Sequence, residues 1–210
     1  SITMVPGDTM PRGINVASPE SAIVKSLLER FAHQAETLIC GLLPEYRASL
    51  IHGRMSYRPA EVSQRPISDN RYDDRLLHVD AFPSQPTRGA RILRVFSNVN
   101  THGESRIWRL GEPFERAADR FKRELVQPFP GMLTLQGMLK PARRRRTPYD
   151  HLMLQLHDRL KLTAGYQQEA SQAEVHFPPD TSWIVFTDQV LHAALAGRQM
   201  LEKTFYIPVA

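Results

Sequence analysis

From Arg58-Pro59 onward the chain alternates short β-type runs with turn residues, and few folds accept such a pattern. Each run is rich in β-branched, aromatic or leucine residues, and each is long enough for only one strand. Many short strands separated by irregular loops are typical of a sandwich or a small barrel. The expected strands are 76–79, 91–98, 105–109, 183–186 and 204–209.

Helical patterns precede and interrupt these strands. Apolar residues recur at three- and four-residue intervals in the segments 18–38, 112–125 and 148–162. Ser18-Pro19 begins the first segment well, because a serine can cap a helix and a proline suits its first turn. Pro44 begins another helical run that Gly53 closes, so we expect an N-terminal helical hairpin.

Length and composition favour a single α+β domain. The 210 residues contain 41% hydrophobic and 23% charged side chains, the proportions of a folded globular protein. One cysteine, Cys40, allows no intramolecular disulfide and favours a reducing compartment. No run approaches the roughly 20 apolar residues that cross a bilayer. We expect a helical part over 1–56 and a β core with inserted helices over 57–210.

The charge of the chain is unevenly distributed. The formal net charge is +5, and four consecutive arginines, Arg143 to Arg146, concentrate part of the excess. A local positive field of this kind suits phosphates or carboxylates. Nucleic acid and an anionic lipid surface are both candidate partners on this evidence.

His78-Val79-Asp80 places an imidazole and a carboxylate two positions apart at the end of an expected strand. Side chains alternate along a strand, so both groups turn to the same face and can share one metal ion. The spacing alone is weak evidence, since a surface histidine beside a carboxylate is the ordinary interpretation. The order of features is stronger: the pair is followed, over a hundred residues later, by a histidine at a strand end with basic residues downstream.

That later histidine is His192, which follows a β-rich run that would close the sheet beside the first two ligands. Two histidines and one carboxylate form the facial triad that holds iron(II) and leaves three positions for cosubstrate and dioxygen. The sequence therefore predicts an iron site formed by His78, Asp80 and His192. The remaining histidines are expected to serve packing or the surface.

A 2-oxoglutarate cosubstrate would need a basic partner for its distal carboxylate. Arginine suits this role because its planar fork makes two parallel charge-assisted bonds. Arg94 is one candidate, with Asn98 as an amide partner on the same strand face. Arg198 and Lys203, downstream of His192, are the others, and spacing does not choose between them.

Several longer blocks resemble the Kdo (3-deoxy-D-manno-octulosonic acid) hydroxylase family. The first is His78-Val79-Asp80-Ala81-Phe82-Pro83-Ser84, followed by Arg88-Gly89 and the run from Arg91 to Asn100. The blocks from Arg145 to Asp158 and from Trp183 to Gln189 strengthen the likeness. The resemblance covers most of the chain from about Arg58 to the end.

The resemblance implies an Fe(II)- and 2-oxoglutarate-dependent dioxygenase with a double-stranded β-helix (jelly-roll, cupin-like) core and supporting helices. It implies hydroxylation by O2 of C3 of the Kdo on Kdo-lipid A, a lipopolysaccharide precursor, to give D-glycero-D-talo-octulosonic acid. Ascorbate is an optional further reductant. The triad carries over onto His78, Asp80 and His192. The expected location is the cytoplasm of a Gram-negative bacterium, with peripheral attachment to the inner membrane and no transmembrane segment.

An anionic sugar on a phosphorylated lipid would also be a ligand for the arginine cluster. The candidate substrate-binding residues are Arg58, Arg145, Arg146, Tyr149 and His151. These could grip carboxylates and phosphates near a membrane surface. The alternative is a solvated basic loop with no ligand.

Two other classes compete with this interpretation. Another metal-dependent cupin enzyme acting on a small anionic sugar would use the same barrel, but such sites usually recruit three or four histidines. A basic nucleic-acid-binding protein draws support from the arginine run. The sequence has no recognisable nucleic-acid-binding motif, and no aromatic residues alternate with those arginines. We therefore expect no nucleic-acid partner.

Overall fold

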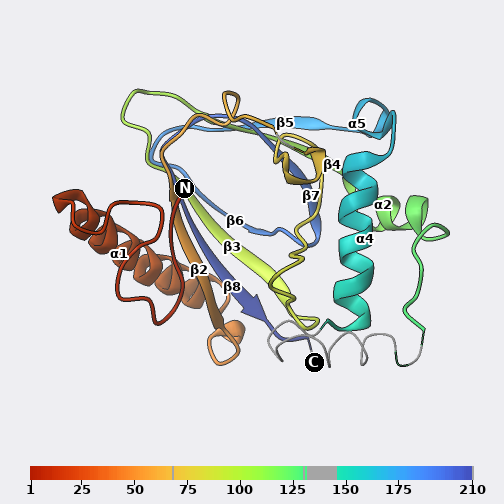
Figure 1. Ribbon diagram of the computed structural model, residues 1–210, viewed down its shortest axis with the longest axis horizontal. Helices are drawn as coiled ribbons and strands as arrows, with labels where there is room; N and C mark the ends of the chain where they lie inside the picture. Colours follow the sequence, from red (N-terminus) through yellow and green to blue (C-terminus); the bar gives the residue numbers. More distant parts are fainter. Residues whose placement is uncertain (68, 130, 132–145, 210) are drawn as a thin grey trace.

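Two antiparallel sheets form the body of the protein (Figure 1). The computed structural model describes residues 1–67, 69–129, 131 and 146–209. The larger sheet has the spatial order β1 (Ile2–Met4), β2 (Ile51–Arg58), β8 (Met200–Ile207), β3 (Arg91–Asn98) and β6 (Ser182–Phe186). The smaller sheet has the order β5 (Ala173–Phe177), β4 (Arg106–Pro113) and β7 (Val190–Ala196).

The chain passes repeatedly between the two sheets, which is the topology of a double-stranded β-helix. After β3 it crosses to β4 and β5 in the smaller sheet, returns to β6, crosses to β7 and ends in β8. His78 pairs with His192 in an isolated antiparallel bridge, which adds the segment before β3 to the open edge of β7. The expected jelly-roll core is thereby confirmed, and the expected strand 76–79 is reduced to a single bridge.

An aromatic cluster fills the space between the sheets. Phe96 on β3 packs edge-on against Trp108 on β4, with ring centroids 4.9 Å apart. Trp183 on β6 stacks on Phe177 of β5 at 3.9 Å. Because strand side chains alternate between faces, each of these residues turns inward while its neighbours turn outward.

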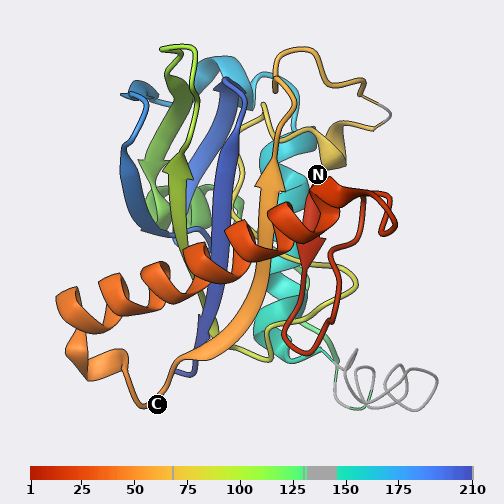
Figure 2. The ribbon, with the colours of Figure 1, turned by 90° about the vertical axis from the view of Figure 1, so that its left-hand side faces the viewer.

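Helix α1 (Pro19–Leu42) covers the outer face of the larger sheet (Figure 2). Its buried apolar residues recur at helical spacing and meet the outward-facing residues of β3 and β8. The contact residues are Leu28, Phe31, Ala35 and Ile39 on the helix and Leu93, Val95, Leu201 and Phe205 on the strands. This layer fixes the position of β8, which lines the site described below.

Helices α2 (Phe114–Phe121), α4 (Pro148–Leu162) and α5 (Tyr166–Glu169) pack on the side of the smaller sheet. Thr147 and Asp150 form a capping box that fixes the start of α4, and the helix has the bounds that the sequence predicts. The buried residues of these helices pack against Leu77, Val79 and Leu191, which flank the two histidines of the bridge. The helical layer therefore supports the segment that carries His78.

The N-terminal part differs from the expected helical hairpin. After α1 there is one 3-10 turn, η1 (Pro44–Tyr46), and the chain then enters β2 at Ile51. Gly53 lies within β2 and does not end a helix. A glycine is required at this position, because a Cβ there would lie 2.8 Å from the ring of Tyr206 and 3.0 Å from the Thr204 carbonyl oxygen. Close pairing with β8 therefore overrides the local proline and glycine signals. Residues 1–56 also contribute β1 and most of β2 to the larger sheet.

A second 3-10 turn, η2 (Asn70–Tyr72), precedes the His78 segment. Within the residues described, no helix is both long and apolar enough to cross a membrane.

Candidate metal centre

The bridge between His78 and His192 brings two imidazoles onto one face. The backbone nitrogen of His78 donates to the His192 carbonyl at 3.1 Å, and His192 returns a bond of 2.9 Å. Directly opposed residues of an antiparallel pair project side chains to the same side. The two rings consequently lie with centroids 4.7 Å apart.

Asp80 joins these histidines from two residues along the chain. Its backbone nitrogen donates to the Thr187 carbonyl at 2.8 Å, which fixes the segment beside the start of β7. One ligand atom from each of His78, Asp80 and His192 lies within 4.8 Å of the others. All three residues are buried. The structure therefore assembles the group that the sequence order predicts.

Both histidines are held with one particular ring nitrogen facing the shared space. Nδ1 of His78 bonds to the carbonyl of Leu76 at 2.8 Å, and Nδ1 of His192 bonds to that of Val190 at 2.9 Å. A carbonyl only accepts, so each Nδ1 carries the hydrogen and each Nε2 keeps a free lone pair. This is the orientation and tautomer that protein metal sites impose on their histidine ligands.

The charges of the group also suit a cation. Burial alone would raise the pKa of Asp80, but nearby cations, Arg94 foremost, hold that pKa well below its ordinary value. Burial lowers the pKa of both His78 and His192. The group therefore combines an ionised carboxylate with two neutral imidazoles, the forms that bind a metal. Asp80 Oδ1 lies 3.8 Å from Nε2 of His78, and the buried Oδ2 has no hydrogen-bond partner in the described residues apart from its ion pair with Arg94.

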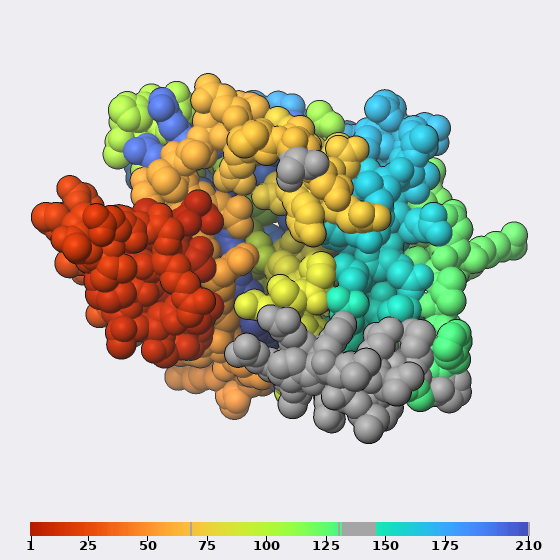
Figure 3. Space-filling model, viewed as in Figure 1, coloured from red at the N-terminus to blue at the C-terminus, as the bar shows by residue number. Residues whose placement is uncertain are grey.

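A cavity of about 120 Å³ opens beside the three ligands. Trp108 forms one wall and stacks on His192 with centroids 5.0 Å apart, and Phe82, Phe96, Ala194 and Met200 complete the apolar lining. The polar lining consists of Arg54, Arg58, Asp74, Arg94 and Glu202. Figure 3 shows the molecule hollowed on this face, between the orange segment of β2 and the yellow segment that carries the His-x-Asp sequence.

A buried carboxylate organises the arginines of this cavity. Glu202 lies 2.9 Å from Arg58 Nη2 and 3.3 Å from Arg94 Nη1. Arg94 also reaches Asp80, with Nη2 3.2 Å from Oδ2. Arg94 thus lies between a candidate metal ligand and Glu202, and its Nε has no hydrogen-bond partner in the described part of the chain.

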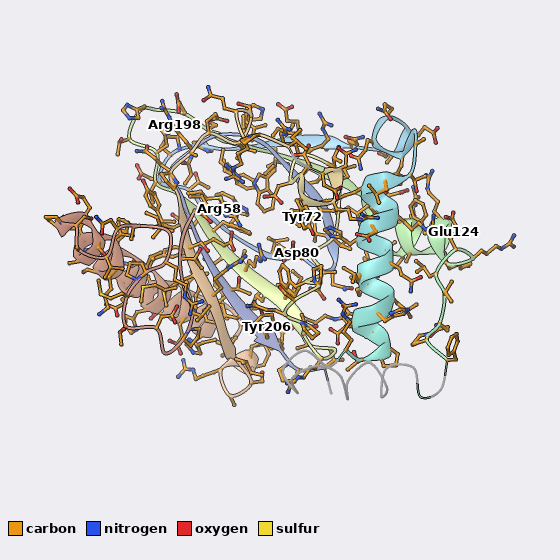
Figure 4. The ribbon with its side chains drawn as sticks, viewed as in Figure 1. Arg58, Tyr72, Asp80, Glu124, Arg198 and Tyr206 are labelled. Atoms are coloured by element: carbon orange, nitrogen blue, oxygen red, sulfur yellow. The ribbon has the colours of Figure 1, made fainter. Side chains whose placement is uncertain are left out.

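The residues expected to bind the cosubstrate do not come together. Arg94 lies in the cavity, whereas the Asn98 amide donates to the carbonyls of Glu104 and Phe177 at 3.0 and 2.9 Å. Arg198 pairs with Glu104 on an exposed turn, and Figure 4 shows it well away from Asp80. Lys203 lies on the opposite face of β8, where its Nζ donates to the Gly53 carbonyl.

The expected substrate-binding residues are also dispersed. Arg58 lines the cavity, and Arg145 lies outside the described residues. Arg146 donates to the Pro83 carbonyl at 2.8 Å. The Tyr149 hydroxyl accepts a hydrogen bond from Arg91 and donates one to Asp188 at 2.9 Å, so Tyr149 stabilises the start of β3. His151 lies two residues later in the same helix and is partly exposed.

Sequence reasoning missed the cavity residues of β2 and β8, namely Arg54, Glu202, Thr204 and Tyr206. The alternation of side chains along the last strand was the sequence signal that could have identified the β8 residues. Residues 200, 202, 204 and 206 share one face of the last strand, and the inner positions of that strand follow His192 closely.

This fold and this site define a class. A buried group of two histidines and one carboxylate, set in a double-stranded β-helix with a basic cavity alongside, is the arrangement of mononuclear non-haem iron(II) oxygenases. The family model described as 3-deoxy-D-manno-oct-2-ulosonic acid (Kdo) hydroxylase matches residues 1–210. The chain belongs to the Kdo hydroxylase family.

Solved structures of the Kdo hydroxylase KdoO, a non-heme Fe(II) alphaketoglutarate dependent dioxygenase, are similar over nearly all of this chain. The complex with alphaketoglutarate and Fe(III) is 44% identical, with a TM-score of 0.88, over 98% of this chain and 70% of that chain. The complex with cobalt(II) is 43% identical, with a TM-score of 0.89, over 99% of this chain and 69% of that one. No relative is found among curated proteins.

Proposed function

We propose that this chain hydroxylates C3 of Kdo as an Fe(II)- and 2-oxoglutarate-dependent dioxygenase. The observation that carries the proposal is the buried group of His78, Asp80 and His192, with both Nδ1 atoms bonded to carbonyls and both Nε2 atoms free. Family membership supports the substrate and the cosubstrate, since KdoO is described with alphaketoglutarate and iron.

The three side chains would hold the iron, which when bound supplies the dioxygen activation that protein groups lack. The chain's own contribution is to orient the ligands and to exclude water. Trp108, 3% exposed, stacks on His192 and limits both ring rotation and solvent access. Phe96 and Met200 line the same cavity and are equally buried.

The cosubstrate would occupy the cavity that contains the three ligands. Of the three arginines that line that cavity, Arg58 and Arg94 lie closest to Glu202, and these two are the basic groups that we expect to meet the carboxylates of the cosubstrate. Asn98 and Arg198 are bonded elsewhere, so Arg94 is the one expected cosubstrate residue that we retain. A planar guanidinium held by a carboxylate is pre-organised for a second anion.

The substrate proposed is Kdo carried on lipid A, met at the cytoplasmic surface of the inner membrane of a Gram-negative bacterium. Arg146 supports this proposal, because its bond to Pro83 sets a cation beside the loop that follows Asp80. Sedimentation with vesicles that contain acidic lipid checks the membrane part. Binding that is equal with neutral vesicles would contradict it.

Alanine variants of His78, Asp80 and His192 test the function. Each variant should bind no iron and form no hydroxylated Kdo, whereas His176→Ala, an exposed histidine paired with Glu174, should match the parent in both assays. Iron content is measured by elemental analysis, and the product by mass spectrometry after reaction in 18O2. A variant that still hydroxylates would remove its residue from the metal site, and a parent that never labels Kdo would overturn the proposed reaction.

A further inference from the structure

Two further cavities lead on from the cavity at the candidate ligands. A second cavity, of about 110 Å³, shares Arg54, Phe82 and Arg94 with it. A third, of about 490 Å³, shares Ser84, Gln85 and Tyr206 with the second. Together they form one groove that runs from the candidate metal centre to the surface beside Arg12 and Ile51.

The second cavity presents buried donors that lack partners. Thr204 is 1% exposed, and its hydroxyl has no hydrogen-bond partner in the part of the chain that the structure describes. Arg54 also lines this cavity; its side chain is partly exposed and pairs with Glu202, but its Nε is buried and has no hydrogen-bond partner in the described residues. Burial raises the pKa of Tyr206, so its phenol keeps the proton it can donate. Because an unpaired buried donor costs free energy, a cluster of them in a cavity indicates a ligand that accepts hydrogen bonds.

The cluster lies to one side of the position proposed for the cosubstrate, although Arg94 lines both cavities. Arg58 pairs with Met200 and Tyr206 pairs with Ile51, so Arg58 and Tyr206 lie toward opposite ends of the β2–β8 pair, Arg58 in the first cavity and Tyr206 in the second. In Figure 4 Arg58 lies above the level of Asp80 and Tyr206 below it. No candidate metal ligand lines the second cavity, so a carboxylate seated there would not itself bind the metal, while a carbon two bonds away could extend into the adjoining first cavity. The cluster therefore suits the part of the substrate that is bound but not oxidised.

We propose that Arg54, Thr204 and Tyr206 bind the carboxylate of the acceptor sugar acid, and that the third cavity holds the glycan unit next to it. This inference rests on the proposed function. A carboxylate accepts bonds from a guanidinium and two hydroxyls at once, and the second cavity is large enough only for a small group. The third cavity lies within the size range of ordinary small-molecule sites, and Ser84, Gln85 and Thr87 give it polar walls.

Binding measurements on the cobalt(II) and 2-oxoglutarate form test the proposal without turnover. Thr204→Val with Tyr206→Phe removes two hydroxyls and little volume, and should weaken calorimetric binding of a Kdo-containing acceptor about tenfold or more. Binding of 2-oxoglutarate should stay within about twofold of the parent. Tyr46→Phe, on the α1 side of the larger sheet, is the matched control and should change neither.

Each outcome has one meaning. Weaker acceptor binding with unchanged 2-oxoglutarate binding supports the carboxylate site, and Arg54→Gln should then reproduce it. Unchanged acceptor binding in the double variant overturns the inference, as does a loss confined to 2-oxoglutarate. A parent protein that binds 2-oxoglutarate but no Kdo-containing acceptor would overturn the proposed substrate, and the groove assignment with it.

Discussion

Replacement of Glu202 by glutamine should be among the most destabilising isosteric changes in this protein. Glu202 is 1% exposed and lies among three arginines, with Arg58 at 2.9 Å, Arg94 at 3.3 Å and Arg54 at 3.7 Å. Glutamine keeps the shape of the side chain but removes the charge that neutralises those guanidinium groups. Removal of one partner from a buried ion pair typically costs about 3–5 kcal/mol.

The pKa of Glu202 gives an independent magnitude. Burial alone would raise it, but the arginines, Arg58 foremost, lower it from an ordinary 4.5 to about 2. A fall of that size corresponds to roughly 3 kcal/mol of stability from the ionised group. The pKa is depressed in the folded state, so this contribution is complete above about pH 4.5 and is lost as the pH falls toward 2.

Urea unfolding of the metal-free protein, followed by circular dichroism, measures this difference. At pH 7 Glu202→Gln should lower the free energy of unfolding by roughly 3 kcal/mol, and the gap from the parent should narrow below pH 4.5. Glu104→Gln is the matched control, because Glu104 pairs with Arg198 at an exposed site and should matter far less. A Glu202→Gln protein as stable as the control, or a gap that widens on acidification, would refute the reasoning.

Two further predictions concern the frame of the site. Burial lowers the pKa of Lys203 to about 8. As the pH rises from about 8 to 10.5, the free energy of unfolding of the parent should therefore increase relative to that of Lys203→Met, by at most about 3 kcal/mol. A difference between the two proteins that does not change with pH would contradict this. A Cβ at Gly111 would lie 2.9 Å from Leu191 Cβ. Gly111→Ala should therefore lower the free energy of unfolding by about 1–3 kcal/mol and weaken cobalt binding at His192, the neighbour of Leu191. An unchanged melting curve would argue against such close packing.

Two of the three candidate metal ligands could be predicted from sequence because they depend on local order. His78 and Asp80 are two residues apart, and a strand alone puts them on one face. His192 could be paired with them through its place after a β-rich run. Helix α4 was equally accessible, since Thr147-Pro148 and Asp150 are a cap, a first-turn proline and a capping-box partner in sequence.

The rest of the site depends on pairing across the whole chain. Arg54 and Arg58 reach the cavity only because β2 pairs with β8, which lies some 150 residues later, with Arg58 opposite Met200. Local signals around Pro44 and Gly53 indicated a helix instead, and no local rule reports the close approach of Gly53 to Tyr206. Asn98 was assigned to the site by alternation, but its amide is used by the carbonyls of Glu104 and Phe177.

The central claim is that His78, Asp80 and His192 hold iron in a form that chelates 2-oxoglutarate. Anaerobic titration with iron(II), followed by 2-oxoglutarate, tests it through the visible charge-transfer band of the chelate. We predict a band that saturates at one iron per chain in the parent protein and is absent from Asp80→Ala. A folded parent protein with no band, or an equally strong band in Asp80→Ala, would contradict the account.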